Sequence, residues 1–408
     1  MKVAIIGFGD RGLNYAHHFR NCGAELVAIC DVRDTQLKNA GDAYNLSADQ
    51  LFNNEDDFWA KGKLADLLVV STLDQLHYKH VMKAIELGYD ILLEKPIAST
   101  MQQCKDIEKA AKEHGTKIYL CYVLRYTPFF MKVKEIIDSG VLGKVASINL
   151  TEGVGYWHQS HSYVRGNWRN SDESSPMIIA KCSHDMDILY WLMDKEPVAV
   201  SSMGNLMFFN EENAPEGAAM HCCDCKHHDT CVYCNYRFYS QFPTWLLKMG
   251  LCEWNEDPAY IREVLKDKTN PYSRCVFHCD NNVVDHQVTN IEFEGGATAH
   301  LTMTAFAKLE SRTIRVHGTH GELFGAFVDN KLHLGKYGED GLIEIPTEEI
   351  AEGGHGGGDI LMIRNITEAY AENRVIDKNG IEGAMCSHYM GFAAEESRLK
   401  GGEKVSLK

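Results

Sequence analysis

The sequence lacks long apolar runs and lacks an excess of positive charge. No stretch approaches the roughly 18 consecutive apolar residues of a membrane span. The formal net charge is −16. Because nucleic acids and anionic membrane surfaces are bound through clustered Lys and Arg, this charge argues against both as partners. The N-terminus also lacks the charged, apolar and cleavage regions of a signal peptide. We therefore expect a cytoplasmic protein whose natural partner is a small polar molecule.

Internal repeats, low-complexity tracts and Pro- or Ser-rich linkers are also missing. At 408 residues the chain is longer than a single hydrophobic core usually supports, which favours two domains. Without a linker between them, these domains should pack closely. The chain has 14 cysteines, and in a reducing compartment most of them should be free thiols or metal ligands.

The hydrophobic pattern predicts an α/β fold in two parts. In the first part, apolar runs typical of buried strands alternate with helical periodicity, which indicates a doubly wound parallel sheet. After about residue 124 the strands are longer and partly alternating, which suits a mostly antiparallel sheet with one covered face. The expected strands of the two parts are 3–6, 26–30, 67–70, 91–93 and 118–121, then 145–151, 198–204, 283–294, 297–306 and 313–318. We expect domains over residues 1–123 and 124–408, and a last helix over 360–370.

A glycine motif follows the first expected strand. It reads Gly7-Phe8-Gly9-Asp10-Arg11-Gly12, a GxGxxG sequence between a strand and an amphipathic helix. In that context Gly7 allows the tight turn, Gly9 lets the backbone approach a pyrophosphate and Gly12 lets the helix pack on its strand. The free N–H groups of the helix would face the phosphates. The motif therefore predicts a Rossmann domain that binds a dinucleotide.

An acidic residue in the expected position indicates which dinucleotide is bound. Asp31 ends the second apolar run, about 20 residues after the motif, where a carboxylate accepts from the adenosine ribose hydroxyls. A carboxylate there repels a 2′-phosphate, so NAD is favoured over NADP. Arg33 lies close by in the sequence and keeps NADP open as an alternative.

The fourth strand ends in Glu94-Lys95-Pro96, at the sheet edge where open α/β folds bind ligands. With the glycine motif before it and a sheet-forming second half after it, the chain resembles the Gfo/Idh/MocA superfamily, named for glucose-fructose oxidoreductase, inositol dehydrogenase and rhizopine catabolism. The resemblance covers essentially the whole chain. It implies an NAD(P)-binding Rossmann domain, a C-terminal domain on a large open sheet and oxidoreductase activity.

The resemblance also implies catalytic residues. Lys95 matches the family lysine that contacts the nicotinamide ribose and the substrate hydroxyl, where an ammonium polarises the reacting oxygen. His184 matches the catalytic histidine of a His-x-x-Asp helix whose acid is Asp187, expected near the substrate. Many members carry an aspartate four residues before that histidine, but here the residue is Ala180. Lys181 beside it is a candidate to substitute as cation or acid.

Further residues are expected around the cofactor and the substrate. Ser71, Thr72 and His77 match the segment beside the adenosine and ribose, although His77 suits a packing role equally well. Trp168 and Arg169 match a pair near the nicotinamide, and Glu94 is the neighbour of Lys95. Polar groups expected on the substrate face are Tyr156, His158, His161, His278, Asp285 and His286, and His355 in the glycine-rich loop 353–359 is a further candidate.

Cysteines are concentrated in an expected insertion near residues 210–240. Cys222 and Cys225 form one CxxC pair, and Cys231 and Cys234 form a second. Two such pairs can hold a structural zinc ion through four thiolates. The five residues between the pairs are fewer than in common zinc ribbons. An iron–sulfur centre and free or redox-active thiols therefore stay open as alternatives.

Together these features predict an NAD(P)-dependent oxidoreductase that moves a hydride between nicotinamide and a secondary hydroxyl of a sugar, inositol or glycoside. The absence of an acid at Ala180 keeps a redox-assisted glycosidase or lyase open, in which transient oxidation precedes elimination. A non-catalytic sensor of sugar and NAD is a second alternative. A large sheet with one face to cover favours a homodimer or homotetramer.

Overall fold

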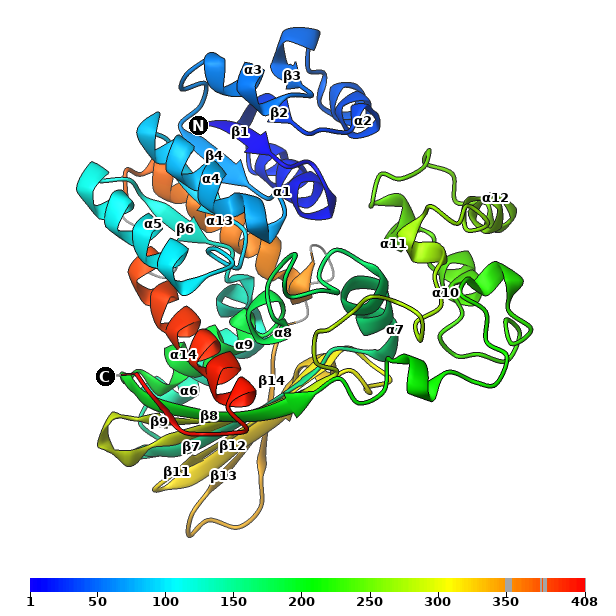
Figure 1. The fold of residues 1–408 in the computed structure, drawn as a ribbon. Coiled ribbons are helices and arrows are strands. Elements are labelled where there is room, and N and C mark those ends of the chain that lie inside the picture. Colours follow the sequence, from blue (N-terminus) through cyan, green and yellow to red (C-terminus); the bar gives the residue numbers. More distant parts are fainter. Residues whose placement is uncertain (349–353, 375, 377–379, 408) are drawn as a thin grey trace.

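The computed structural model describes residues 1–348, 354–374, 376 and 380–407. It contains two sheets, and helices lie between them and on the outer side of the first sheet (Figure 1). No helix in these ranges is long and apolar enough to cross a membrane.

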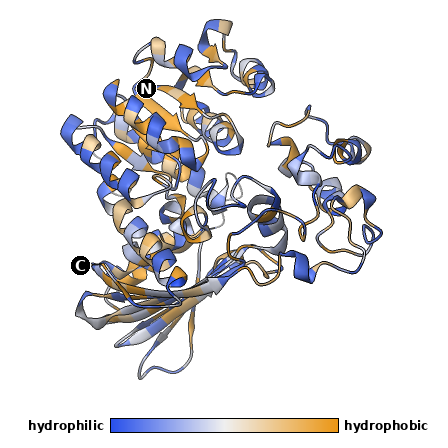
Figure 2. Ribbon diagram, viewed as in Figure 1, coloured by the Kyte–Doolittle hydropathy of each residue, from blue (hydrophilic) through white to orange (hydrophobic). Residues whose placement is uncertain are grey.

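The first sheet is a six-stranded parallel sheet in the order β3-β2-β1-β4-β5-β6. Its strands are β1 (Lys2–Ile6), β2 (Glu25–Cys30), β3 (Leu51–Phe52), β4 (Leu67–Val70), β5 (Asp90–Leu93) and β6 (Ile118–Leu120). They are joined by α1 (Asp10–Asn21), α2 (Asp34–Tyr44), α3 (Glu55–Ala60), α4 (Asp74–Glu86) and α5 (Met101–His114). Because helices cover both faces, the strands are apolar after their first residue (Figure 2). The predicted parallel sheet is confirmed.

The second sheet has nine strands in the order β14-β13-β12-β11-β7-β10-β9-β8-β15. Only β7 and β10 pair in parallel, so the prediction of a mostly antiparallel sheet is confirmed. The strands are β7 (Val145–Gly153), β8 (Pro197–Asn205), β9 (His286–Phe293), β10 (Thr298–Thr304), β11 (Ser311–Gly318), β12 (Gly321–Ala326), β13 (Lys331–Lys336), β14 (Ile343–Pro346) and β15 (Val405–Ser406).

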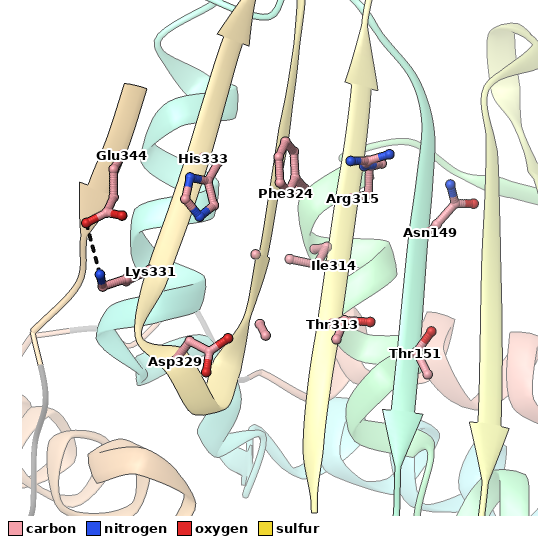
Figure 3. A pocket seen from close by; sticks show the side chains of 12 residues that line it. Asn149, Thr151, Thr313, Ile314, Arg315, Phe324, Asp329, Lys331, His333 and Glu344 are labelled. Atoms are coloured by element: carbon pink, nitrogen blue, oxygen red, sulfur yellow. Dashed lines mark ion pairs between the residues drawn. The ribbon is translucent and has the colours of Figure 1, made fainter. Parts of the chain in front are cut away.

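Helices cover the face of this sheet that points toward the first sheet. They are α6 (Pro128–Asp138), α8 (Met177–Ala180), α9 (Ser183–Met193) and α14 (Ile381–Leu399). The opposite face carries a shallow open hollow of about 780 Å³, where Arg315, Phe324 and His333 lie side by side on neighbouring strands (Figure 3). None of the predicted site residues lines this hollow.

The chain returns to the first sheet near its end. Helix α13 (Gly358–Ala371) places Met362, Ile363 and Ile366 in the same core as β1. It is not the last helix, as the periodicity suggested, because α14 follows it and packs beside α9 and β8. The division of the chain at 123/124 stays a prediction.

The cysteine-rich insertion forms a separate small lobe, at the right of Figure 1. It contains α10 (Asn235–Gln241), α11 (Thr244–Leu247) and α12 (Pro258–Val264), so it extends beyond the predicted range of 210–240. Its own apolar core consists of Tyr239, Leu246, Leu247, Ile261, Leu265 and Tyr272. The short helix α7 (Tyr156–His158) comes earlier in the chain, before α8, α9 and β8.

Candidate active site

The glycine motif forms the turn between β1 and α1. Gly7 has a φ of 89°, and a Cβ there would lie 2.7 Å from the backbone of Ser71. A Cβ on Gly12 would lie 2.1 Å from the carbonyl oxygen of Gly7. Only glycine fits at either position, so the backbone of α1 starts directly beside β1 and β4. The fit agrees with the roles predicted for these two glycines in a phosphate-binding turn.

Asp31 directly follows β2, and its carboxylate accepts four hydrogen bonds from within the protein. Its Oδ2 accepts from the Phe8 N–H at 2.7 Å and from Arg33 Nη2 at 2.9 Å. Its Oδ1 accepts from the N–H of Arg33 at 3.0 Å and from Nε at 2.9 Å. A carboxylate has about four acceptor sites, so a ribose hydroxyl has to take the place of an Arg33 donor.

The insertion lobe contacts the first domain beside this turn. Lys248 Nζ lies 2.7 Å from Asp10 Oδ1, and Arg33 Nη1 donates to the Met249 carbonyl at 2.5 Å. Asp10 and Arg33 were both predicted as cofactor residues. Their contacts with the lobe place residues 248 and 249 next to the glycine turn.

Arg11 links the turn to the Glu94-Lys95-Pro96 segment and to helix α13. Its Nε donates to Glu94 Oε1 at 2.7 Å, and its Nη2 donates to Asp359 Oδ1 at 2.6 Å. Burial alone would raise the pKa of Glu94, but Arg11 and Lys95 hold it below its usual value. Glu94 is therefore an ionised structural partner and not a free acid.

Lys95 reaches from the end of β5 to α8. Its Nζ donates to the carbonyl of Ala180 at 2.5 Å. The backbone of Ala180 thus contacts the ammonium at the position where the family resemblance led us to look for an aspartate side chain. Burial lowers the pKa of Lys95 from its ordinary value, opposed by the charges of Glu94 and Asp74.

His184 begins α9 close to Lys95. Its side chain is buried, and its Nδ1 has no hydrogen-bond partner among the described residues. Its ring lies 6.0 Å from that of Tyr122 and 5.6 Å from that of His355. Burial, with the nearby charge of Lys95, holds the pKa of His184 well below 6.5. The imidazole is therefore neutral at physiological pH and able to accept a proton.

Lys181 stands in a charged network beside this pair. Its Nζ lies 2.8 Å from Glu310 Oε1 and 3.4 Å from Glu152 Oε1. Burial alone would lower the pKa of Lys181, but these two carboxylates raise it above its usual value. His158 Nδ1 lies 3.0 Å from Glu310 Oε1 on the other side. Lys181 therefore holds its proton firmly and acts as a fixed cation.

Arg312 completes this network from β11. It lies 2.9 Å from Glu152 Oε2 and 2.7 Å from Asp185 Oδ1. Sequence reasoning missed Glu152, Glu310 and Arg312. Glu152 on β7 and Arg312 on β11 lie on strands whose alternation gives no hint that inward positions are charged, and Glu310 lies in the loop directly before β11. Asp359, the partner of Arg11, was visible only as part of the glycine-rich loop.

His77 stabilises the turn after Lys95 through contacts with two backbone carbonyls. Its Nδ1 lies 2.7 Å from the carbonyl of Pro96, and its Nε2 lies 3.0 Å from that of Thr72. Ser71 Oγ donates to the Gly7 carbonyl at 2.8 Å, so it ties the end of β4 to the glycine turn. These contacts give His77 and Ser71 positioning roles within the chain.

The adjacent residues Trp168 and Arg169 form hydrogen bonds with different parts of the protein. Trp168 Nε1 donates to Asp74 Oδ1 at 2.8 Å, and Asp74 is one of the charges that act on Lys95. Arg169 instead pairs with Asp280 through two hydrogen bonds of 2.8 and 2.9 Å. The structure therefore associates Trp168, and not Arg169, with the Lys95 region.

Several predicted substrate residues have other partners. Asp187 is buried and held by two hydrogen bonds from Arg125. His161 bonds to Tyr239 Oη at 2.7 Å and stacks on Tyr272, within the insertion. Asp285 accepts from the backbone of residues 207 and 208 and pairs with His286. His278 lies 3.6 Å from Glu211.

His355 lies closer to the catalytic candidates than its place in the sequence indicates. Its Nδ1 lies 3.1 Å from Asp359 Oδ2, and its ring neighbours that of His184. Residue 353 of the glycine-rich loop lies outside the described residues.

The predicted zinc site is not supported. Within the described ranges, which include all four cysteines, no group of three or more His, Cys, Asp or Glu side chains could hold a metal ion. Cys222 instead contacts Cys234 and lies 3.9 Å from Arg165 Nη2. Cysteine spacing alone could not show that a buried arginine occupies this region.

Comparison with known families matches both halves of the chain. The NAD-binding Rossmann domain of the Gfo/Idh/MocA oxidoreductase family matches residues 1–122, and the C-terminal alpha/beta domain of that family matches residues 134–398.

Among characterised and named relatives, YteT of Bacillus subtilis, a protein named as an oxidoreductase, is 24% identical over 74% of this chain and 72% of its own. An inositol 2-dehydrogenase/D-chiro-inositol 3-dehydrogenase of Lactiplantibacillus plantarum is 26% identical over 48% of this chain and 53% of its own. The latter alignment thus spans about half of each protein.

Solved structures share the whole fold at low sequence identity. A levoglucosan dehydrogenase with NADH and levoglucosan has a TM-score of 0.72 and 16% identity, and covers 100% of this chain and 99% of its own. The WlbA dehydrogenase of Bordetella pertussis, with NADH and UDP-GlcNAcA, has a TM-score of 0.69 and 17% identity, with 100% and 99% covered. The chain belongs to the Gfo/Idh/MocA family of NAD-dependent oxidoreductases.

Proposed function

We propose that the protein oxidises a secondary hydroxyl of a sugar, inositol or glycoside with NAD. The observation that carries the proposal is the meeting of Lys95 and His184 at the carboxyl edge of the parallel sheet, next to the glycine turn. Levoglucosan dehydrogenase and the inositol dehydrogenases act on such molecules by their names, which supports the substrate class.

In the proposed reaction Lys95 and His184 have different roles. Bound NAD would supply the hydride acceptor. The Lys95 ammonium would donate a hydrogen bond to the reacting oxygen and stabilise its developing negative charge. The neutral His184 imidazole would take the hydroxyl proton as the carbinol C–H bond breaks. The Lys181 cation, paired with Glu310, would fix the electrostatic field of the pocket without exchanging its proton.

NAD is the proposed cofactor, with NADP as the alternative. The residues fit a dinucleotide, because a Cβ at Gly7 or Gly12 would collide with the backbone. Asp31, Arg33, Phe8, Gly9 and Thr72 would surround the adenosine, ribose and pyrophosphate end, and Trp168 would lie toward the nicotinamide end. In this assignment Asp187 is a positioning residue for α9 and not a substrate ligand.

The carbonyl of Ala180 in place of an acid favours a second candidate, redox-assisted cleavage of a glycoside. Oxidation of a ring hydroxyl acidifies the neighbouring C–H bond, elimination releases the aglycone, and the reduced cofactor then restores the alcohol. Such a reaction consumes no net NAD.

One assay separates these functions from a sensor that binds without turnover. The protein is mixed with NAD and a panel of inositols, sugars and glycosides, while NADH and released aglycone are both measured. NADH alone indicates a dehydrogenase, and aglycone without lasting NADH indicates redox-assisted cleavage. Binding without either product contradicts the catalytic proposal.

A further inference from the structure

A second pocket lies between α7 and the insertion lobe. Its volume is about 160 Å³, similar to engineered cavities of about 150 Å³ that take one six-membered ring. Aromatic side chains from both sides line it, namely Tyr156, Trp157, Tyr233 and Phe238. Trp157 and Phe238 stack with their ring centroids 5.8 Å apart and their planes 19° apart.

Two arginines, Arg165 and Arg237, line the same pocket. Arg165 is buried, and its Nε and Nη2 donate to the carbonyls of Arg274 and Tyr233 at 2.7 and 2.8 Å. Arg237 is exposed. In the part of the chain that the structure describes, no carboxylate lies within 4.0 Å of either guanidinium, and no Asp or Glu lines the pocket. The buried Arg165 already has a partner, because its Nη2 lies 3.9 Å from Cys222 Sγ, and the hydrogen bond from Cys234 and the charge of Arg165 lower the pKa of Cys222 to about 5. Arg237 is the pocket cation that a ligand can still pair with, in a protein of net charge −16.

This combination points to a ring that carries an anion. Guanidinium groups bind carboxylates and phosphates through paired hydrogen bonds, and aromatic walls pack against the flat faces of a ring. An anionic ligand would pair with the Arg237 guanidinium at the edge of the aromatic wall. A neutral ligand would leave Arg237 without a counter-charge.

The segment 156–165 connects the pocket to the Lys95 region. Tyr156 and Arg165 face the pocket, whereas His158 between them bonds to Glu310, the partner of Lys181. The ring of His158 also stacks on that of Trp157, at 5.5 Å. A substrate longer than one ring would meet both surfaces of this segment.

We propose that this pocket is a distal substrate subsite that binds a sugar unit bearing a carboxylate or a phosphate. The inference rests on the proposed function in one respect, because it takes the ligand to be part of the oxidised substrate. The insertion lobe then selects acidic saccharides, while Lys95 and His184 carry out the chemistry on the neighbouring unit.

The test measures binding by calorimetry with the NAD-loaded protein. The probes are glucuronic and galacturonic acids, the 6-phosphates of glucose and galactose, and the two neutral parent sugars. We expect at least one acid or phosphate to bind about tenfold or more tightly than its neutral parent, since charge-assisted hydrogen bonds are the stronger kind. Preference for the acid or for the phosphate identifies the anion.

Arg237→Met should remove this preference, and Arg262→Met is the matched control. Arg262 is an exposed arginine on α12 of the same lobe, outside the pocket. Equal binding of charged and neutral sugars to the wild type, or an unchanged preference in Arg237→Met, would overturn the subsite. Because binding is measured without turnover, an anion preference without NADH or aglycone formation would contradict the proposed function and leave the subsite standing.

Discussion

At the scale of single residues, the candidate site depends on one lysine with a lowered pKa and one neutral histidine. Lys95→Met removes the ammonium from the reacting oxygen and leaves the Arg11–Glu94 ion pair in place. We expect the rate of sugar oxidation to fall by about 10²–10⁴-fold, with NAD affinity nearly unchanged. Steady-state kinetics and a fluorescence titration of NAD check this. Lys109→Met, an exposed lysine of α5, should keep full activity.

The pH profile reports on the same pair. His184 works as a base only when it is neutral, and its pKa lies well below 6.5 because it is buried. Activity should therefore persist at pH 6.5 and decline only at pH values well below it. Burial also lowers the pKa of Lys95, so activity should fall at high pH before the ordinary lysine range. An acid limb centred at 6.5 or above in kcat/KM would contradict the assignment of His184.

Single residues also show where sequence reasoning succeeds. The glycines, Asp31, Lys95 and His184 belong to local motifs, and the structure places them at one edge of the first sheet. Glu152 on β7 is far in the sequence from Glu310 and Arg312 at the start of β11, and only the pairing of these two strands brings their charges together around Lys181. No local pattern marks such a network.

At the scale of elements, α9 is fixed by a buried ion pair. Asp187 and Arg125 are both almost fully buried and joined by two hydrogen bonds. Asp187→Ala leaves a buried guanidinium without this carboxylate and should lower the free energy of unfolding by about 3–5 kcal/mol. Asp138→Ala removes an exposed pair with Lys134 and should cost less than about 1 kcal/mol. Chemical denaturation measures both, and equal small effects would refute the role of Asp187.

Helix α1 depends on close contact with the glycine turn. Gly12→Ala places a Cβ 2.1 Å from the Gly7 carbonyl, so the start of α1 has to move. We expect a lower melting temperature and a loss of NAD binding of at least tenfold. Gly383→Ala is the control, because no atom lies within 4 Å of its Cβ position in α14. It should stabilise the protein by up to about 1 kcal/mol.

Elements were predicted best where the periodicity was unbroken. The buried parts of the strands of the first sheet are continuous apolar runs, and all five expected strands are present. Strands β12, β13 and β14 were missed, because their exposed outer face interrupts the apolar pattern with polar residues and glycines. Helix α14 was missed because it is rich in small and polar residues that nevertheless pack against β8 and α9.

At the scale of the whole molecule, the nine-stranded sheet leaves one face without helices (Figure 1). We propose that a second copy of the chain covers this face. Arg315 and Phe324, whose guanidinium and ring are 4.4 Å apart, lie at its centre. The protein should therefore elute as a dimer or tetramer in size-exclusion chromatography with light scattering. Phe324→Glu should shift it toward the monomer, and a monomeric wild type would contradict the proposal.

The central claim is that Lys95 and His184 carry out reversible oxidation of a sugar hydroxyl with NAD. The most direct measurement is a single-turnover experiment, in which excess NAD-loaded protein is mixed with the saccharide panel and the absorbance of reduced nicotinamide is followed. It detects net oxidation and transient oxidation alike. We predict that at least one saccharide produces reduced nicotinamide with the wild type, and that Lys95→Met produces it about 10²–10⁴-fold more slowly. Absence of any reduced nicotinamide from the wild type, with NAD bound, would contradict the account.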